Sequence, residues 1–205
     1  MTAEKKKNRL IGEDTEMTHE KTKTITGVAI LMAIVIVLQL LGSFIRFGPF
    51  SISLVLIPIV VGAALYGPFA GGLLGLTFGA VVLLSGDAAP FLAVNVFGTI
   101  LTVLLKGALA GVFAGLVFRM FKKNETLGTV LSAAVCPITN TGIFLLGCLL
   151  FFLPTISQWA AGLGFESVGK YMIFGLVGGN FLAELLTNII LSPIILCIIR
   201  IGKNK

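Results

Sequence analysis

Residues 25–44 read ITGVAILMAIVIVLQLLGSF, a run of 20 residues with no charged side chain. A helix that crosses the hydrocarbon core of a membrane needs about 20 apolar residues. A secretory signal peptide has a shorter apolar core that ends at a small-residue cleavage site, whereas this run leads into further apolar segments. We therefore interpret residues 25–44 as a first transmembrane helix. The preceding residues 1–24 carry six basic and five acidic side chains, and we expect a solvated, flexible cytoplasmic tail there.

The whole chain has the composition of a membrane protein. Of its 205 residues, 57% are hydrophobic and only 12% are charged, and the mean hydropathy is +1.06. A soluble domain carries about 25% charged residues, so most of this surface must face lipid or other helices. We predict an all-α polytopic membrane protein with one domain at residues 25–200 and a short cytoplasmic tail at 201–205. Its six transmembrane helices are expected at residues 25–44, 52–66, 68–84, 91–121, 127–153 and 171–199.

The basic residues indicate how the chain is oriented. With the N-terminus inside, the expected cytoplasmic segments hold 12 Lys and Arg residues, and the outer segments hold two, Arg46 and Lys170. Basic residues accumulate on cytoplasmic loops, so we predict both termini in the cytoplasm of a bacterium and a multi-pass protein of the cell membrane. The net charge of +6 does not indicate nucleic-acid binding, because the basic residues are not interleaved with aromatic residues on one face.

Small residues recur every four positions on three of the expected helices. Such rows let helix backbones approach closely in lipid, where van der Waals packing drives association. We expect the two glycine rows to pack within the chain. The pair Ala29 and Ala33 would meet either another helix of this chain or a partner subunit. The glycine rows are Gly71, Gly75, Gly79 and Gly107, Gly111, Gly115.

Two polar stripes lie at membrane depth, where ionisable groups usually face the bundle interior or a water-filled cavity. One stripe is Asn95, Thr99, Thr102 and Lys106, and the other is Asn180, Glu184 and Asn188. The spacing puts each stripe on one helix face. Lys106 and Glu184 have matching depths, so an ion pair between them is plausible. This pair either ties two helices together or forms the floor of a polar cavity.

The fifth expected helix adds polar groups near mid-membrane. Its segment 136–142 reads CPITNTG and includes Asn140 and Thr141. Pro137 frees a backbone carbonyl, so these side chains could turn toward a ligand, unless the segment is only a kink satisfied by neighbouring helices.

The outer loops carry a cation and the only tryptophan. Arg46 lies in the aromatic loop 43–50, and Trp159 lies in the loop 154–170. Trp159 would serve either as an anchor at the membrane interface or as part of a lid over an outward-facing pocket. Asp87 is most simply a solvated loop residue.

Catalysis and bound cofactors are not indicated. The only histidine, His19, is in the tail, and Asp87 is the only aspartate beyond it, so the chain has no aspartate pair or metal-ligand cluster at depth. The three cysteines show no paired spacing and are expected to be buried apolar residues. No GxxxxGK[ST] phosphate loop is present, so we do not expect the chain to hydrolyse ATP by that route.

The first three expected helices resemble those of the substrate-binding S-components of energy-coupling factor (ECF) vitamin transporters. Residues 29–33, AILMA, match the AxxxA pattern of that family, and residues 53–59, SLVLIPI, are followed by a family-like run of small residues and Gly67-Pro68. The resemblance covers about 180 residues after residue 24. It implies a non-enzymatic subunit that binds a vitamin, without a cofactor, at its outer face between the last three helices. It further implies docking to a T-component with two ATP-binding subunits.

Carried onto this chain, the resemblance implies a set of site residues that agrees with the polar stripes. The docking residues would be Ala29 and Ala33. If Lys106 and Glu184 neutralise each other, Arg46 is left as a cation for a carboxylate ligand. Pantothenate fits that description, and the CPITNTGIF stretch resembles pantothenate-type members; riboflavin or folate would need more aromatic surface than the stripes offer. The substrate-binding residues would be Arg46, Asn95, Lys106, Asn140, Thr141, Trp159, Asn180 and Glu184.

Two other interpretations remain open. One is a stand-alone ion-coupled secondary transporter that uses Lys106 and Glu184. Such carriers commonly contain inverted repeats, and residues 25–121 and 127–200 show no convincing repeat. The other is a structural membrane subunit, which predicts that Lys106, Asn140 and Asn180 tolerate apolar replacement.

Overall fold

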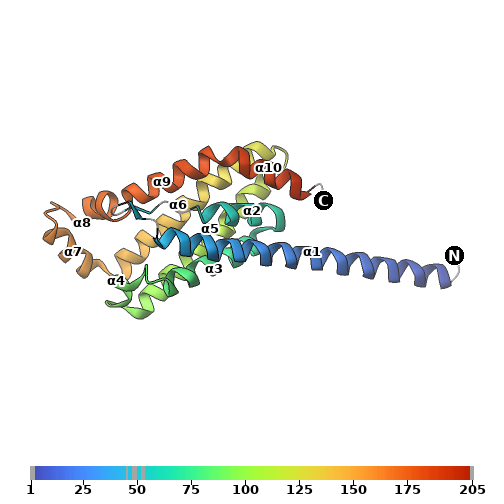
Figure 1. Cartoon of the computed structure of the whole chain (residues 1–205), viewed down its shortest axis with the longest axis horizontal. Helices are drawn as coiled ribbons and strands as arrows, with labels where there is room; N and C mark the ends of the chain where they lie inside the picture. Colours follow the sequence, from blue (N-terminus) through green and yellow to red (C-terminus); the bar gives the residue numbers. More distant parts are fainter. Residues whose placement is uncertain (1–2, 45, 48–49, 52–53, 204–205) are drawn as a thin grey trace.

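A computed structural model describes the backbone of residues 3–44, 46–47, 50–51 and 54–203, and the side chains of residues 21–42 and 54–203. The chain is a bundle of helices with one short antiparallel hairpin between the first two (Figure 1). The elements are α1 (Ala3–Phe44), β1 (Arg46–Phe47), β2 (Phe50–Ser51), α2 (Leu56–Tyr66), α3 (Pro68–Leu84), α4 (Ala89–Leu92), α5 (Val96–Met120), α6 (Glu125–Phe151), α7 (Leu153–Gly162), α8 (Val168–Lys170), the π-helix η1 (Tyr171–Val177), α9 (Gly178–Ile190) and α10 (Ser192–Lys203).

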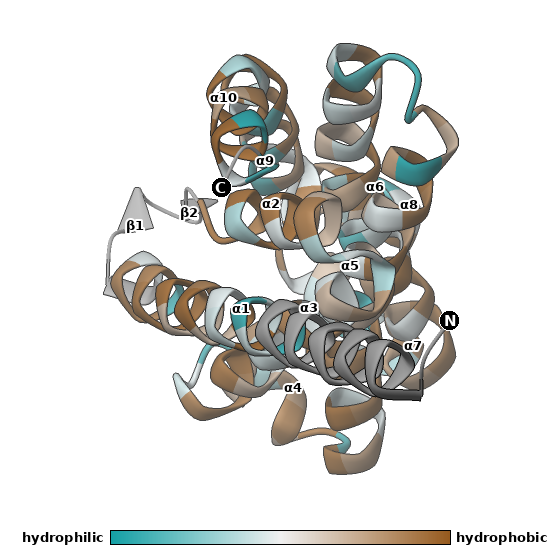
Figure 2. Cartoon of the chain, turned by 90° about the vertical axis from the view of Figure 1, so that its right-hand side faces the viewer, coloured by the Kyte–Doolittle hydropathy of each residue, from teal (hydrophilic) through white to brown (hydrophobic). Residues whose placement is uncertain are grey.

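Among the described residues, four helices are long and apolar enough to cross a membrane: Lys21–Gly42, Val96–Met120, Glu125–Phe151 and Val168–Ile190. The apolar helices α2 and α3 are shorter. Many large apolar side chains are exposed on the outside of the bundle. Figure 2 colours most of the helical ribbon brown, which marks hydrophobic residues. Lipid is the solvent that such a surface requires, so this is a multi-pass membrane protein.

The two glycine rows pack against each other, as predicted. Gly71 and Gly75 on α3 meet the backbone of Gly111 and Gly107 on α5, and a Cβ atom on Gly79 would lie 2.7 Å from the carbonyl oxygen of Val103. Only glycine permits so close a contact between two backbones.

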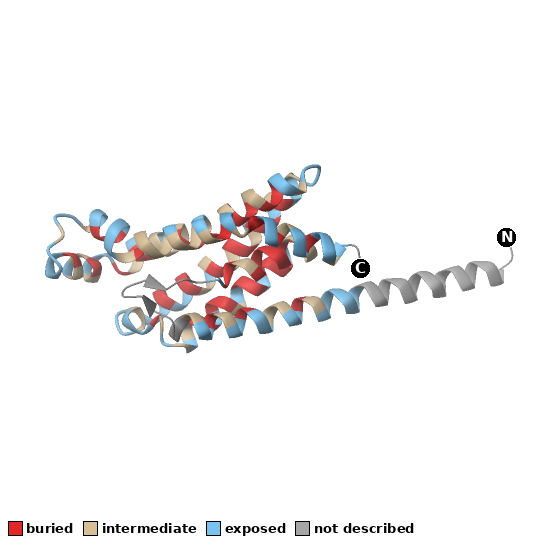
Figure 3. Ribbon diagram, turned by 45° about the horizontal axis from the view of Figure 1, so that its top comes forward, coloured by how far each residue is buried: buried red, intermediate tan, exposed pale blue. Residues whose placement is uncertain are grey.

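The core lies at the centre of the bundle, where Figure 3 shows most of the buried residues. There α2 contacts α1, α3, α5, α6 and α10. Its residues Leu56, Ile59 and Val60 are 0% exposed.

The single helix expected at residues 91–121 is instead two, α4 and α5. Residue Asn95 between them has an extended backbone, with φ −151° and ψ 100°, and its side chain accepts a hydrogen bond of 2.9 Å from the backbone N–H of Gly98. This is N-capping, which satisfies a free N–H at the start of α5.

The last expected helix, residues 171–199, is also interrupted. It begins as the π-helix η1, continues as α9, and breaks at Leu191 before α10. Pro193 is the second residue of α10. Proline has no N–H to donate to the preceding turn and clashes with the carbonyl four residues earlier, so it favours a helix start there.

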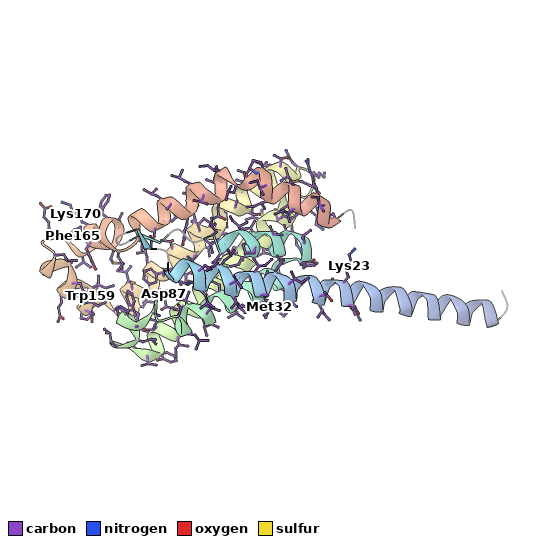
Figure 4. All side chains as sticks on the ribbon, in the orientation of Figure 1. Lys23, Met32, Asp87, Trp159, Phe165 and Lys170 are labelled. Carbon is purple, nitrogen blue, oxygen red and sulfur yellow. The ribbon has the colours of Figure 1, made fainter. Side chains whose placement is uncertain are left out.

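At the N-terminus, α1 begins at Ala3 and not at Ile25, so residues expected to form a flexible tail are helical. The two ends of the bundle differ in composition. Lys23 lies at one end, and Asp87, Trp159, Phe165 and Lys170 lie at the other (Figure 4).

Candidate functional site

A lysine lies in the middle of the bundle, enclosed by aromatic rings. Lys106 of α5 is half-buried, and its Nζ lies 5.5 Å from the ring centroid of Phe78 on α3 and 5.3 Å from that of Phe144 on α6. The negative faces of aromatic rings attract a cation within about 6 Å. The two rings therefore stabilise the ammonium group where water is scarce.

The expected ion pair between Lys106 and Glu184 is not formed. Between described side chains, the ion pairs are those of Glu166 with Lys170 and of Glu125 with Lys203 and Arg200. Lys106 and Glu184 belong to α5 and α9, which each pack against α6. The ammonium group is thus left with two aromatic faces and no directly bound carboxylate in the described part of the chain.

Within the described part of the chain, three buried side-chain oxygens have no hydrogen-bond partner: Thr102 Oγ1 on α5, Asn140 Oδ1 on α6 and Asn188 Oδ1 on α9. These residues are 4%, 5% and 0% exposed, respectively. An unsatisfied buried polar atom costs about 1–3 kcal/mol, so each one in a native structure needs an explanation. One explanation is that these oxygens accept hydrogen bonds from the hydroxyl or N–H groups of a ligand.

The polar groups of α5 and α6 flank the lysine. Thr102 lies one turn before Lys106 and contacts Gly147 of α6, where a Cβ atom would overlap the threonine side chain. Asn140 lies one turn before Phe144 and shares its helix face. Sequence reasoning placed Thr102 on a polar stripe but not in the site, since only the contact with α6 reveals its buried, unpartnered oxygen.

On the other side of α6, α9 carries the second polar stripe. The side-chain amide of Asn188 donates a 2.8 Å hydrogen bond to the backbone carbonyl of Glu184. That donation leaves its carbonyl oxygen buried without a partner. Asn180 and Glu184 are half-buried on the preceding turns of the same helix.

An aromatic cluster adjoins the lysine, made of Phe91, Phe144, Phe152 and Trp159. The ring of Phe91 is at its centre, with centroid distances of 5.5 Å to Phe144, 5.1 Å to Phe152 and 5.6 Å to Trp159, all edge-to-face. The polar stripes themselves contain few aromatic residues, so these rings add aromatic surface from other positions. The sequence pattern does not predict this cluster, because its rings come from different elements and form no stripe on any one helix.

The remaining site candidates have separate positions. Asn95 uses its side-chain oxygen to cap α5. Thr141 is 9% exposed, next to Asn140 on α6. Arg46 pairs through its backbone strand with Ser51, and its side chain lies outside the described residues. Trp159 is half-buried in the aromatic cluster.

The two proposed docking residues are on the outside of the bundle. Ala29 and Ala33 are exposed on α1, whereas Val28 and Val35 of the same helix face the core. Ala29 and Ala33 therefore contribute little to packing within this chain.

Comparisons with known proteins identify the family of this chain. A family model described as "ECF transporter, substrate-specific component" matches residues 23–200. A curated relative, "Pantothenic acid transporter PanT" of Lactococcus lactis subsp. cremoris (strain MG1363), is 26% identical over 208 residues, which cover 92% of this chain and 100% of the relative. No solved structure matches the chain. Because the family match extends over nearly the whole helical bundle, the chain belongs to the family of ECF transporter substrate-specific components.

Proposed function

We propose that this protein is the S-component of an ATP-driven importer and that its ligand is pantothenate. The family is one of transporter components and not of enzymes. The ligand assignment is supported by the similarity to the pantothenic acid transporter of Lactococcus lactis, which the alignment covers over its full length.

One observation carries the proposal: among the described side chains, the buried oxygens of Thr102 and Asn140 lack partners, and Lys106 has no directly bound carboxylate. Pantothenate has a carboxylate, an amide and two hydroxyl groups. Its carboxylate would pair with Lys106, and its hydroxyl and N–H groups would donate to the unpartnered oxygens. A ligand of this chemistry would offset the cost of leaving those atoms unsatisfied in the free protein.

The aromatic cluster alters the argument against other vitamins. Phe91 and Trp159 add aromatic surface near Lys106, so a flat ring system is not excluded by composition alone. The preference for pantothenate therefore depends on the polar groups and on the relative, and the binding test must include riboflavin and folate.

For the membrane topology, we propose six crossings with both termini in the cytoplasm. Lys203 near the end of α10 contacts Glu125 at the start of α6 through a 2.6 Å hydrogen bond, so the α5–α6 connection and the end of α10 are on one side. That side is rich in basic residues. At 11 residues, α2 alone is too short to cross the hydrocarbon core of the membrane. Because other helices of the bundle surround α2, it does not need the length of a helix that faces lipid. The basic residues are Arg119, Lys122, Lys123, Arg200 and Lys203.

The docking partner would be a T-component coupled to two ATP-binding subunits, in the plasma membrane of a bacterium. The proposed contact is the exposed face of α1 that contains Ala29 and Ala33. Small residues there would let a partner helix approach the backbone of α1 closely.

The test is ligand binding by the purified full-length chain in detergent. Calorimetry with pantothenate, riboflavin and folate should show tight binding of pantothenate alone. Uptake into proteoliposomes should then require the T-component, both ATP-binding subunits and ATP. Absence of vitamin binding, together with uptake driven by an ion gradient without ATP, would contradict the proposal and favour a secondary transporter that uses Lys106 and Glu184.

A further inference from the structure

Asp87, which the sequence suggested to be a solvated loop residue, is half-buried between α3 and α4 and accepts hydrogen bonds from the described side chains of Gln39 and Ser85. Its Oδ2 atom accepts one of 2.9 Å from the side-chain amide of Gln39 and another of 2.9 Å from the hydroxyl of Ser85. Gln39 belongs to α1, 48 residues earlier in the chain. The contact therefore joins the end of α1 to the connection that leads into α4.

Gln39 stands out on its helix. It is 8% exposed, within an apolar helix that otherwise turns aliphatic residues such as Val28 and Val35 toward the core. A buried amide is costly in an apolar environment unless it is hydrogen-bonded, and a carboxylate is the acceptor that binds it most strongly. The Gln39–Asp87 contact thus fixes which part of α1 faces the α3–α4 connection.

From Asp87 the contacts continue to the candidate site. The next residue, Ala88, is 4% exposed and belongs to the same core cluster as Val35 of α1. The short helix α4 follows and carries Phe91 into the centre of the aromatic cluster. Phe91 contacts Phe144, which in turn faces Lys106. Only three residues, 88–90, therefore separate Asp87, which contacts α1, from Phe91 in the aromatic cluster.

We propose that Gln39 and Asp87 are a positioning pair through which α1 holds α4, and with it Phe91, over the candidate ligand site. A shift of α1 that moves Gln39 would displace Phe91 and loosen the aromatic cluster. The functional meaning rests on the proposed function, since the same α1 carries the proposed docking face. Partner docking on α1 and opening of the ligand site would then be linked by a physical contact.

Trp159 supplies the readout, because it is the only tryptophan and its ring lies 5.6 Å from that of Phe91. The full-length protein is measured in detergent without ligand, by the emission maximum and acrylamide quenching of Trp159. Gln39→Met removes the amide donor but keeps an unbranched side chain of similar length. We expect a red-shifted emission and a quenching constant raised about twofold, because the loosened cluster exposes the indole for more of the time.

A matched control removes another buried interhelical hydrogen bond. Ser132 of α6 donates a 2.9 Å hydrogen bond to the backbone carbonyl of Ala114 on α5, outside the aromatic cluster. Ser132→Ala should leave the emission and quenching of Trp159 unchanged. An equal change in Ser132→Ala and Gln39→Met would show a general loosening of the bundle and overturn the proposal.

The second variant, Asp87→Ala, removes the acceptor of the same hydrogen bond. It replaces Gln39→Met in the test if that variant folds poorly. Asp87→Ala should raise the quenching constant at least as much as Gln39→Met. The effect of the double variant should be smaller than the sum of the two single effects, because both changes remove the Gln39–Asp87 contact. Additive effects, or unchanged quenching in the folded single variants, would refute the positioning role. Since no ligand is present, these results are independent of whether the protein binds pantothenate.

Discussion

The ammonium group of Lys106 lies 5.3 Å from the ring centroid of Phe144, at a helix interface where Thr102 and Asn140 leave buried oxygens without partners. A buried cation normally has an opposite charge at hydrogen-bond distance. Here the rings of Phe78 and Phe144 present two aromatic faces to it. The site is therefore prepared for an anionic ligand group that brings both charge and hydrogen bonds.

Replacing the lysine tests this interpretation directly. Lys106→Met should lower vitamin affinity by about 10–100-fold, because a hydrogen bond to a charged group contributes about 1.5–3 kcal/mol. Isothermal calorimetry on the purified protein measures the loss. Lys122→Met, at an exposed position in the α5–α6 connection, is the control and should bind normally. Equal affinities of Lys106→Met and wild type would remove Lys106 from the ligand site.

Replacing Asn140 distinguishes a residue that binds the ligand from one that only packs within the bundle. Its Oδ1 atom is unsatisfied in the free protein, so Asn140→Leu should maintain or raise the melting temperature without ligand. The same variant should weaken ligand binding about 5–10-fold, since the net value of one hydrogen bond is about 1 kcal/mol. Thermal unfolding with and without the vitamin measures both effects.

Ser132→Ala provides the opposite pattern as a control for Asn140. Its hydroxyl is already bonded within the protein, so its loss should cost about 1 kcal/mol of stability and leave affinity intact. If Asn140→Leu instead lost stability and kept full affinity, Asn140 would be a packing residue of the bundle.

The contact between α3 and α5 should be the least tolerant part of the fold. A Cβ atom on Gly75 would overlap the backbone of Gly107, so Gly75→Ala must separate the two helices. We expect a cost of about 1–3 kcal/mol, the usual range for overpacking. Gly142→Ala on α6 is the control, because no other side chain lies within 4 Å of the added methyl group. Unfolding temperatures that are lowered equally in both variants would contradict the close backbone contact.

The parts of the structure that the sequence predicted are those encoded by local periodicity. The glycine rows around Gly75 and Gly107 identified a helix interface, because a row of small residues has one main use in lipid. The polar stripes located Lys106 and Glu184 on interior faces, although the relative positions of α5, α6 and α9 then kept the two charges from pairing.

What could not be predicted depends on contacts between distant segments. Phe91 meets Trp159 only because α4 is a separate short helix, and the cap formed by Asn95 creates that separation. Asp87 looked solvated because its partner Gln39 lies on another helix. The break at Leu191 was missed because a proline within an apolar run can kink a helix as well as end it.

The last prediction concerns the outer face of α1. Ala29→Trp together with Ala33→Trp should abolish vitamin uptake in the reconstituted transporter and leave binding by the isolated protein unchanged, because both residues are exposed and lie away from the buried Val35. Bulky rings would keep a partner helix from approaching the α1 backbone. Ile34→Trp, which is 41% exposed on another side of α1, is the control and should transport normally. Uptake that survives the double substitution would place the docking contact elsewhere, whereas lost binding would show that α1 supports the ligand site itself.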